Sequence, residues 1–250
     1  MGGFSYYKDV DNYATLASYY DELLQDEDSL EYWYQYIQKY AKGKEVLELA
    51  SGSGVMASLL QKRGYHVTAS DLSKDMKAAA QKNFDGEYLI MNMIDFKLDK
   101  KFDLILCICD SMNYLSSFEE MSEMFKNVYA HLNDKGVFIF DMHHQARIKE
   151  FEEEYIEEGI VNKVPYQWTI LSDSVSNNLY EHFVFYEEDG IIQEHHVQHV
   201  FDAKQTKTLL EKNHFKTTLV DDFIEDEKVL LIGEKLWLEL SLRWKKRLML

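Results

Sequence analysis

Two hydrophobic periods alternate along the first 141 residues of the chain. Short apolar runs typical of buried strands, such as EVLELA and FDLILCIC, take turns with segments in which apolar residues recur every three or four positions. Residues 12–41 have the helical period, with an acidic break at 26–28. Strands and helices in strict turn predict right-handed crossovers and a parallel sheet with helices on both faces.

The period changes to two between residues 142 and 201. This stretch predicts antiparallel strands, and Asp189-Gly190 is typical of a hairpin turn. A helical segment, AKQTKTLLEKNHF, then precedes two apolar strands joined by EDE. The main sheet therefore closes with an antiparallel hairpin, whereas ordinary dinucleotide-binding sheets end on a parallel strand. We expect an α/β, Rossmann-like fold with an antiparallel β insertion.

These patterns also predict the domain organisation. Residues 1–141 and 202–235 form one α/β domain, within which residues 1–41 are an N-terminal helical cover. Residues 142–201 form an inserted β lobe that we expect to line the substrate site. The tail, 236–250, fits a strand or a helix and holds the only basic cluster, which is compatible with an edge-strand extension or a homodimer contact.

Composition restricts the partners. The 44 acidic residues exceed the 27 Lys and Arg, so the net charge of −17 argues against nucleic acid and favours a neutral or cationic small molecule. Cys107 and Cys109, two positions apart in an apolar run, are expected to share one strand face as reduced core thiols. The N-terminus lacks an apolar signal stretch and no run is long enough to span a bilayer, which predicts a cytoplasmic protein and no membrane role.

A glycine-rich loop follows the first buried strand. Gly52 and Gly54 let the backbone turn tightly and approach a ligand, and the helix after them presents free N–H groups. This loop suits a dinucleotide or S-adenosylmethionine equally well. Glu48 distinguishes between these two ligands. The pyrophosphate of a dinucleotide would repel it, since two like charges about 4 Å apart cost roughly 4 kcal/mol at a dielectric of about 20, whereas the sulfonium of S-adenosylmethionine would be attracted. An exposed strand-end acid without a ligand is the alternative for Glu48.

Further cofactor contacts are expected where the second and third strands end. Asp71 suits the two ribose hydroxyls, although it could instead cap the next helix, a role that Ser73 already fits. Leu72 beside it can cover one face of the adenine. Asn92 is placed to reach the adenine amino group, and Met93 offers its backbone and its apolar side chain.

With these features the chain resembles the class I S-adenosylmethionine-dependent methyltransferases, whose seven-stranded sheet has its last strand antiparallel. ELASGSG, ASD and FDLILCICDSMNYL correspond to motifs of that class, over residues 12–141 and 202–235. NYATLASYYDELLQ, DSMNYL and the β-rich insertion look like small bacterial methyltransferases of the YqeM type, and are similar to aminosugar N-methyltransferases. The resemblance implies S-adenosyl-L-methionine as cofactor and in-line methyl transfer to a small-molecule nitrogen or oxygen nucleophile.

Two residues differ from the motifs of that class, and the resemblance implies a role for two others. Ala50 replaces the opening glycine of the first motif, and Asn92 replaces an acid. The resemblance implies that the N-terminal Tyr-x-x-x-Ala segment folds over the cofactor, so Tyr13 and Tyr20 are expected to line the methyl-donor pocket, Tyr20 as a candidate catalytic residue.

Candidates for the chemistry follow the fourth and fifth strands. His143 is the first candidate for a base or substrate ligand, because histidine titrates near neutral pH, with a polar loop residue as the alternative. Asp110 and its neighbour Cys109 are better placed to bind the cofactor than to react. In EHHVQH, alternation puts His196 and Gln198 on one face, so three histidines cannot converge from this strand, and a polar, solvent-facing cover strand is expected rather than a metal site.

Three other functions stay open from the sequence. A nicotinamide-dependent oxidoreductase is opposed by Glu48 and by the closing hairpin. A non-catalytic S-adenosylmethionine-binding protein would bind the cofactor without turnover. An RNA methyltransferase is disfavoured by the absence of a basic stripe outside the tail.

Overall fold

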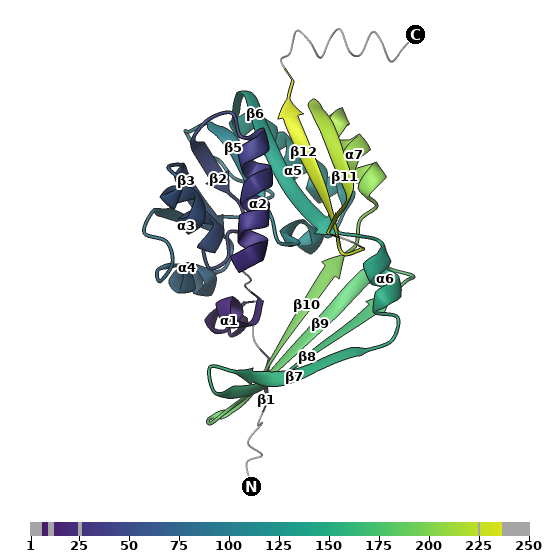
Figure 1. The fold of residues 1–250 in the computed structure, drawn as a ribbon. Coiled ribbons are helices and arrows are strands. Elements are labelled where there is room, and N and C mark those ends of the chain that lie inside the picture. Colours follow the sequence, from purple (N-terminus) through teal and green to yellow (C-terminus); the bar gives the residue numbers. More distant parts are fainter. Residues whose placement is uncertain (1–6, 10–12, 25–26, 225, 237–250) are drawn as a thin grey trace.

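Two sheets form the framework of the computed structural model, which describes residues 7–9, 13–24, 27–224 and 226–236 (Figure 1). The larger sheet has seven strands in the order β11-β12-β6-β5-β2-β3-β4. Its strands are β2 (Glu45–Glu48), β3 (His66–Asp71), β4 (Glu87–Ile90), β5 (Phe102–Cys107), β6 (Leu132–His143), β11 (Phe215–Ile224) and β12 (Lys228–Lys235). β12 is antiparallel to both β6 and β11, while β2 to β6 are parallel, which confirms the predicted methyltransferase-like sheet.

Helices cover both faces of the seven-stranded sheet because its strands are buried on both sides. Neighbouring residues point to opposite faces, so Val46 packs with α2 (Glu27–Tyr40) and α3 (Val55–Lys62). Leu47 packs with α5 (Phe118–His131) and α7 (Ala203–Lys212) on the other face. α4 (Lys74–Ala80) begins after Ser73, whose side chain accepts hydrogen bonds from Asp75 N and Met76 N, as expected for a cap.

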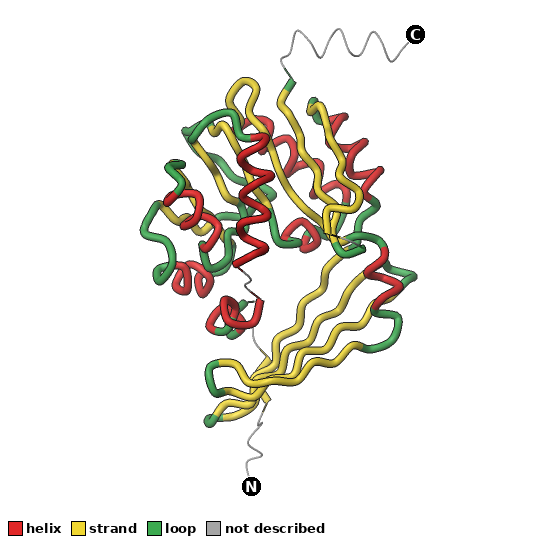
Figure 2. Tube along the Cα trace, viewed as in Figure 1, coloured by secondary structure: helices red, strands yellow, loops and turns green. Residues whose placement is uncertain are grey.

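The second sheet has the order β1-β10-β9-β8-β7. Its strands are β1 (Tyr7–Asp9), β7 (Tyr155–Val161), β8 (Val164–Asp173), β9 (Asn178–Glu187) and β10 (Gly190–His199). The last four form the expected antiparallel sheet, reached through the short helix α6 (Ala146–Glu150), and they extend beyond one end of the larger sheet (Figure 2). β1 pairs in parallel with β10, a contact between distant segments that the sequence did not predict.

The N-terminal cover is less regular than expected from its pattern. It contains a 3₁₀ turn η1 (Leu16–Ser18), the short helix α1 (Tyr20–Leu24) and then α2. Leu16 and Tyr19 pack against β9 rather than continuing one helix, because the buried Phe183 and Phe185 offer an apolar surface there.

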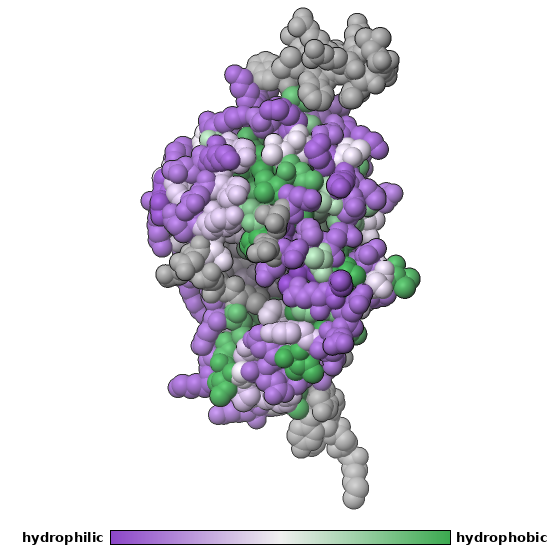
Figure 3. Space-filling view, turned by 45° about the vertical axis from the view of Figure 1, so that its right-hand side comes forward, coloured by the Kyte–Doolittle hydropathy of each residue, from purple (hydrophilic) through white to green (hydrophobic). Residues whose placement is uncertain are grey.

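The surface shown in Figure 3 is mainly hydrophilic, with small apolar patches, in keeping with the excess of acidic residues. Within the described part of the chain, no helix is both long and apolar enough to cross a bilayer. Of the predicted basic tail, residues 237–250 lie outside the described residues.

Candidate active site

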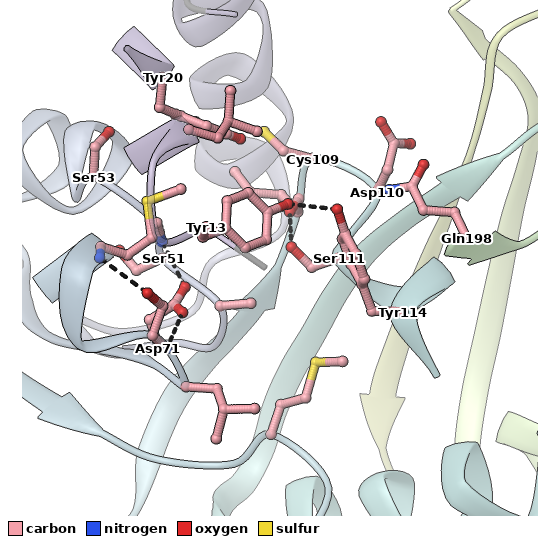
Figure 4. A pocket seen from close by; sticks show the side chains of 18 of the residues that line it. Tyr13, Tyr20, Ser51, Ser53, Asp71, Cys109, Asp110, Ser111, Tyr114 and Gln198 are labelled. Carbon is pink, nitrogen blue, oxygen red and sulfur yellow. Dashed lines mark hydrogen bonds between the residues drawn. The ribbon is translucent and has the colours of Figure 1, made fainter. Parts of the chain in front are cut away.

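A cavity of about 920 Å³ lies between the carboxyl ends of the parallel strands and the inner face of the five-stranded sheet. Its volume is within the range of ligand sites. Every predicted site residue except Gly54 lines this cavity: Tyr13, Tyr20, Glu48, Ala50, Gly52, Asp71, Leu72, Asn92, Met93, Cys109, Asp110 and His143. Figure 4 shows how several of these side chains converge from separate segments. The structure thus brings the predicted residues together, while the role of each stays a prediction.

The glycine loop has a left-handed backbone at three positions. The φ values of Ala50, Gly52 and Gly54 are 50°, 54° and 75°. Glycine adopts this conformation freely, whereas a residue with a Cβ pays about 1–2 kcal/mol. The left-handed backbone at position 50 therefore explains why the related motif has glycine where this chain has Ala50. Gly54 does not line the cavity; it precedes α3, and a Cβ there would lie 3.2 Å from the Cβ of Phe84.

Glu48 ends β2 and is 2% exposed, so it is not the exposed strand-end acid considered above. Ser51 Oγ donates a hydrogen bond of 2.8 Å to its Oε2. Burial raises the pKa of Glu48 from 4.5 to about 8, against the opposing effect of Ser51. The carboxyl is therefore mostly neutral at pH 7 before a ligand arrives. The predicted attraction to a cation consequently depends on ionisation that the cation itself induces.

Asp71 ends β3 and binds the glycine loop. Its Oδ2 accepts from Gly52 N at 3.0 Å and its Oδ1 from Ser73 N at 2.8 Å. Burial raises the pKa of Asp71, although these backbone hydrogen bonds oppose the rise. Each carboxylate oxygen retains a second lone pair for a ribose hydroxyl, so the predicted binding role and the structural role are compatible.

The predicted adenine contacts lie on the same side of the cavity. Leu72 is 68% exposed, which leaves its side chain free to cover a ring. Asn92 Oδ1 accepts from Ile94 N at 2.8 Å, so the amide is already held in a tight turn. Met93 is partly buried against the core, where Cys107 Sγ lies 3.9 Å from its sulfur.

The expectation that Cys107 and Cys109 share one strand face is wrong. β5 ends at Cys107, which is buried, and Cys109 follows with φ of 60° in the left-handed region. Asp110 also has positive φ, at 62°. Two such residues in succession break the alternation and expose Cys109 to the cavity.

Asp110 belongs to a buried charge cluster that sequence reasoning missed. Lys228 Nζ at the start of β12 contacts Asp110 Oδ2 and lies 3.2 Å from Asp141 Oδ2. Burial lowers the pKa of Lys228, but the two carboxylates outweigh it and raise that pKa. Burial raises the pKa of Asp110 while His143 and Lys228 outweigh it, so the net shift is downward. Burial raises the pKa of Asp141 to about 6.

His143 is 7% exposed and engaged on both sides of its ring. Its Nε2 lies 2.7 Å from Gln198 Oε1, and its Nδ1 lies 3.5 Å from Asp110 Oδ1. Its backbone N–H donates to Asn113 Oδ1 at 3.0 Å. To act as a base, the imidazole would first have to give up one of these partners. The geometry therefore suits a positioning role at least as well as the predicted role of base.

Tyr13 and Tyr20 line the cavity (Figure 4), with ring centroids 6.1 Å apart. Burial raises the pKa of both phenols well above the usual value. Neither is therefore a phenolate near neutral pH, which argues against Tyr20 as an ionised base. Tyr13 Oη lies 2.7 Å from Tyr114 Oη, and Tyr114 Oη lies 2.9 Å from His196 Nδ1.

The prediction of a solvent-facing strand for EHHVQH is wrong for one of its faces. Glu194, His196 and Gln198 are 0%, 1% and 5% exposed, because this face of β10 is covered by the N-terminal segment and the strand ends. The outer face matches the prediction, since His195 is exposed. The period-two pattern already separated these faces, but only the fold shows which one is inside.

The inner face of the five-stranded sheet contributes the far end of the cavity. Trp168, Ile170, Glu181, Phe183 and Gln198 line it. Trp168 Nε1 donates a hydrogen bond of 3.1 Å to Glu181 Oε2, and burial raises the pKa of Glu181. Sequence reasoning predicted a substrate lobe here but none of these residues, apart from noting the strand face of Gln198.

The side chains fit a cationic nucleoside better than a dinucleotide. Glu48 and Asp71 supply acceptors near the glycine loop. Asp110 Oδ1 is buried and accepts no hydrogen bond within the described part of the chain, although His143 Nδ1 lies 3.5 Å away. A buried carboxylate oxygen that faces a cavity without a hydrogen bond favours a hydrogen-bond donor or a cation as ligand.

Comparison with known proteins agrees with this chemistry. Residues 46–136 match the family model described as a methyltransferase domain. The chain is 26% identical over 246 residues to a Geobacillus protein with a provisional methyltransferase name, covering 89% of this chain and 99% of the relative. YqeM of Bacillus subtilis, whose methyltransferase name is also provisional, is 27% identical over 226 residues, covering 86% and 91%.

Among solved structures, the sugar N-methyltransferase KedS8 from Streptoalloteichus superimposes with a TM-score of 0.79 at 18% identity, covering 95% of this chain and 98% of KedS8. This likeness shows the fold. Together with the family match and the relatives, it confirms the resemblance to class I, YqeM-like methyltransferases. The domain match and these relatives indicate that the chain is a methyltransferase.

Proposed function

We propose that this methyltransferase transfers a methyl group from S-adenosylmethionine to the nitrogen of a small-molecule amine. The observation that supports it best is the far end of the cavity, where the Glu181 carboxyl lies among Trp168 and Phe183. A carboxyl with aromatic neighbours suits an ammonium or amine. KedS8, which has the same fold, is a sugar N-methyltransferase, so a sugar-like amine is a natural member of the class to test.

In this proposal S-adenosylmethionine and the methyl acceptor occupy different parts of the cavity. Glu48, Asp71, Leu72 and Asn92 hold S-adenosylmethionine at the strand ends, with Tyr13 and Tyr20 as a cover. When bound, the cofactor supplies a methyl group on a cationic sulfur. The protein contributes alignment and a dry site, because such an in-line displacement depends on near-attack geometry.

The Asp110–Lys228–Asp141 cluster has a positioning role in this arrangement. It joins the end of β5, β6 and the start of β12, and Asp110 and Lys228 of this cluster line the cavity. His143 is held against it, so the cluster fixes the boundary between the cofactor and acceptor ends.

The test is a methylation assay with defined acceptors. The purified chain and S-adenosylmethionine are incubated with primary amines including amino sugars, with phenols and alcohols, and with RNA, and methylated products are detected by mass spectrometry. We expect products from amines only. Glu181→Gln should raise KM for the amine roughly tenfold, the effect of one charged contact. The matched control is Glu188→Gln, at an exposed turn residue. Methylation of RNA or of hydroxyl groups, with no amine product, would contradict the proposal.

A further inference from the structure

Four hydrogen-bonded polar side chains lead from the cavity to a buried carboxylate. Tyr13 Oη and Tyr114 Oη are 2.7 Å apart, and Tyr114 Oη is 2.9 Å from His196 Nδ1. His196 Nε2 is 2.9 Å from Glu194 Oε1. Glu194 and His196 are 0% and 1% exposed, so this end of the series is inaccessible to water.

Glu194 fixes the direction of these hydrogen bonds. Its Oε2 accepts from Thr15 N and Leu16 N at 3.0 Å each, and its Oε1 accepts from Tyr13 N. Burial raises the pKa of Glu194, but the hydrogen bonds from His196 and from this backbone outweigh it and leave the pKa lowered. An ionised carboxylate can only accept, so His196 Nε2 must donate to it.

The remaining donors follow from that constraint. With its proton on Nε2, a neutral His196 accepts at Nδ1, so the Tyr114 hydroxyl donates to it. The oxygen of Tyr114 then accepts from the Tyr13 hydroxyl. Burial keeps both phenols protonated, since it raises the pKa of each well above the usual value. The oxygen of Tyr13 therefore presents only lone pairs to the cavity.

The backbone of Tyr13 supports this assignment. Its φ is 62°, in the left-handed region that a bulky residue rarely adopts. Glu194 accepts hydrogen bonds from the backbone N–H of Tyr13 and from the imidazole of His196, so one carboxylate fixes both ends of this series of hydrogen-bonded side chains. Strained residues held in this way occur preferentially at functional sites.

We propose that Glu194 and His196 are positioning residues that make the Tyr13 hydroxyl a hydrogen-bond acceptor for the N–H of the methyl acceptor. The relay presupposes the amine of the proposed function. It also provides a route for the proton of an ammonium: Tyr13 takes it, passes its own to Tyr114, and Tyr114 passes its own to His196 Nδ1. The freed nitrogen lone pair attacks the methyl carbon, and the electrons of the broken carbon–sulfur bond stay on sulfur.

A second proton on His196, at Nδ1, would reverse the direction of the hydrogen bonds between His196, Tyr114 and Tyr13. Nδ1–H would then donate to Tyr114, Tyr114 to Tyr13, and Tyr13 into the cavity, where it would oppose an N–H donor. Three further carboxyl groups act on these side chains: Glu181 on β9 on Tyr13, Tyr114 and His196, Asp71 on Tyr13, and Asp110 on Tyr114. A variant of His196 is therefore needed to separate its contribution from that of Glu181.

The test uses two cofactor analogues, so it needs no acceptor. Sinefungin has an amine where the reacting methyl group lies, and S-adenosylhomocysteine has none. The ratio of their affinities, measured by calorimetry from pH 5.5 to 8, removes effects common to both. We expect the preference for sinefungin to fall at acidic pH roughly tenfold more in the wild type than in His196→Gln or Tyr114→Phe, the effect of one hydrogen bond to a charged group. The pH dependence that a cationic amine acquires through Glu48 is common to all variants, and His195→Gln, on the exposed outer face, should match the wild type.

A ratio that changes with pH equally in His196→Gln and His195→Gln would overturn the relay. Tyr114→Phe removes a single oxygen, so it tests the relay even if His196→Gln fails to fold. With an amine substrate, His196→Gln should lower kcat ~100-fold and remove the acidic limb of the pH profile. If the wild type methylates no amine, the proposed function fails, while the affinity ratio still decides the relay.

Discussion

Glu48→Gln tests the electrostatic basis of cofactor binding. Burial raises the pKa of Glu48 to about 8, so roughly nine-tenths of the molecules hold its proton at pH 7. A cationic ligand stabilises the carboxylate and expels that proton. We therefore expect S-adenosylmethionine to release close to one proton on binding at pH 7. Its affinity should rise with pH by up to about tenfold per unit below pH 8. Glutamine copies the neutral acid but cannot ionise, so the variant should lose both effects.

The same pKa shift has a consequence for stability. The folded protein holds the Glu48 proton up to about pH 8, whereas the unfolded chain releases it near 4.5. The stabilisation is therefore fully present below pH 4.5 and is lost as the pH rises to about 8. At 1.36 kcal/mol per unit the loss amounts to about 5 kcal/mol. The variant should not show this part of the pH dependence in chemical denaturation without ligand.

The assay is calorimetry at pH 6, 7 and 8 in buffers with different ionisation enthalpies, which gives the protons released. Glu45→Gln is the matched control, because Glu45 begins the same strand and pairs with Lys100 at 2.8 Å. Equal proton release by the wild type and Glu48→Gln would refute the reasoning. So would an affinity of the wild type that does not change between pH 6 and 8.

Three further substitutions test the loop and the charge cluster. Asp71→Asn should weaken S-adenosylhomocysteine binding about 10–100-fold in calorimetry, since a carboxylate is replaced by an amide with one acceptor oxygen; unchanged affinity would assign the residue to the loop alone. Lys228→Met leaves two buried acids without their cation and should cost about 3–5 kcal/mol in urea unfolding, part of which the additional Asp141→Asn should restore. Gly54→Ala, at φ of 75°, should lower the unfolding free energy by about 1–2 kcal/mol, whereas Ala50→Gly, at 50°, should not lower it.

Local pattern determined most of the fold. Apolar periods of two and of three to four place most strands and helices, though not β1, η1 or α6, because burial on one or both faces leaves a direct trace in residue order. The closing hairpin of β11 and β12 followed from two apolar runs with a short turn between them. The glycine loop, Glu48 and Asp71 were also accessible, since strand ends in a parallel sheet meet at one edge.

Tertiary structure decided the properties that depend on distant neighbours. Lys228 reaches Asp110 across 118 positions, and Tyr114 reaches His196 across 82, so no local pattern could pair them. The covering of β10 turned an apparently solvent-facing set of polar residues into a buried relay. Protonation follows the same rule: residue type fixes the ordinary pKa of Glu48, but only burial by the surrounding chain raises it to about 8, because a charge loses its hydration there.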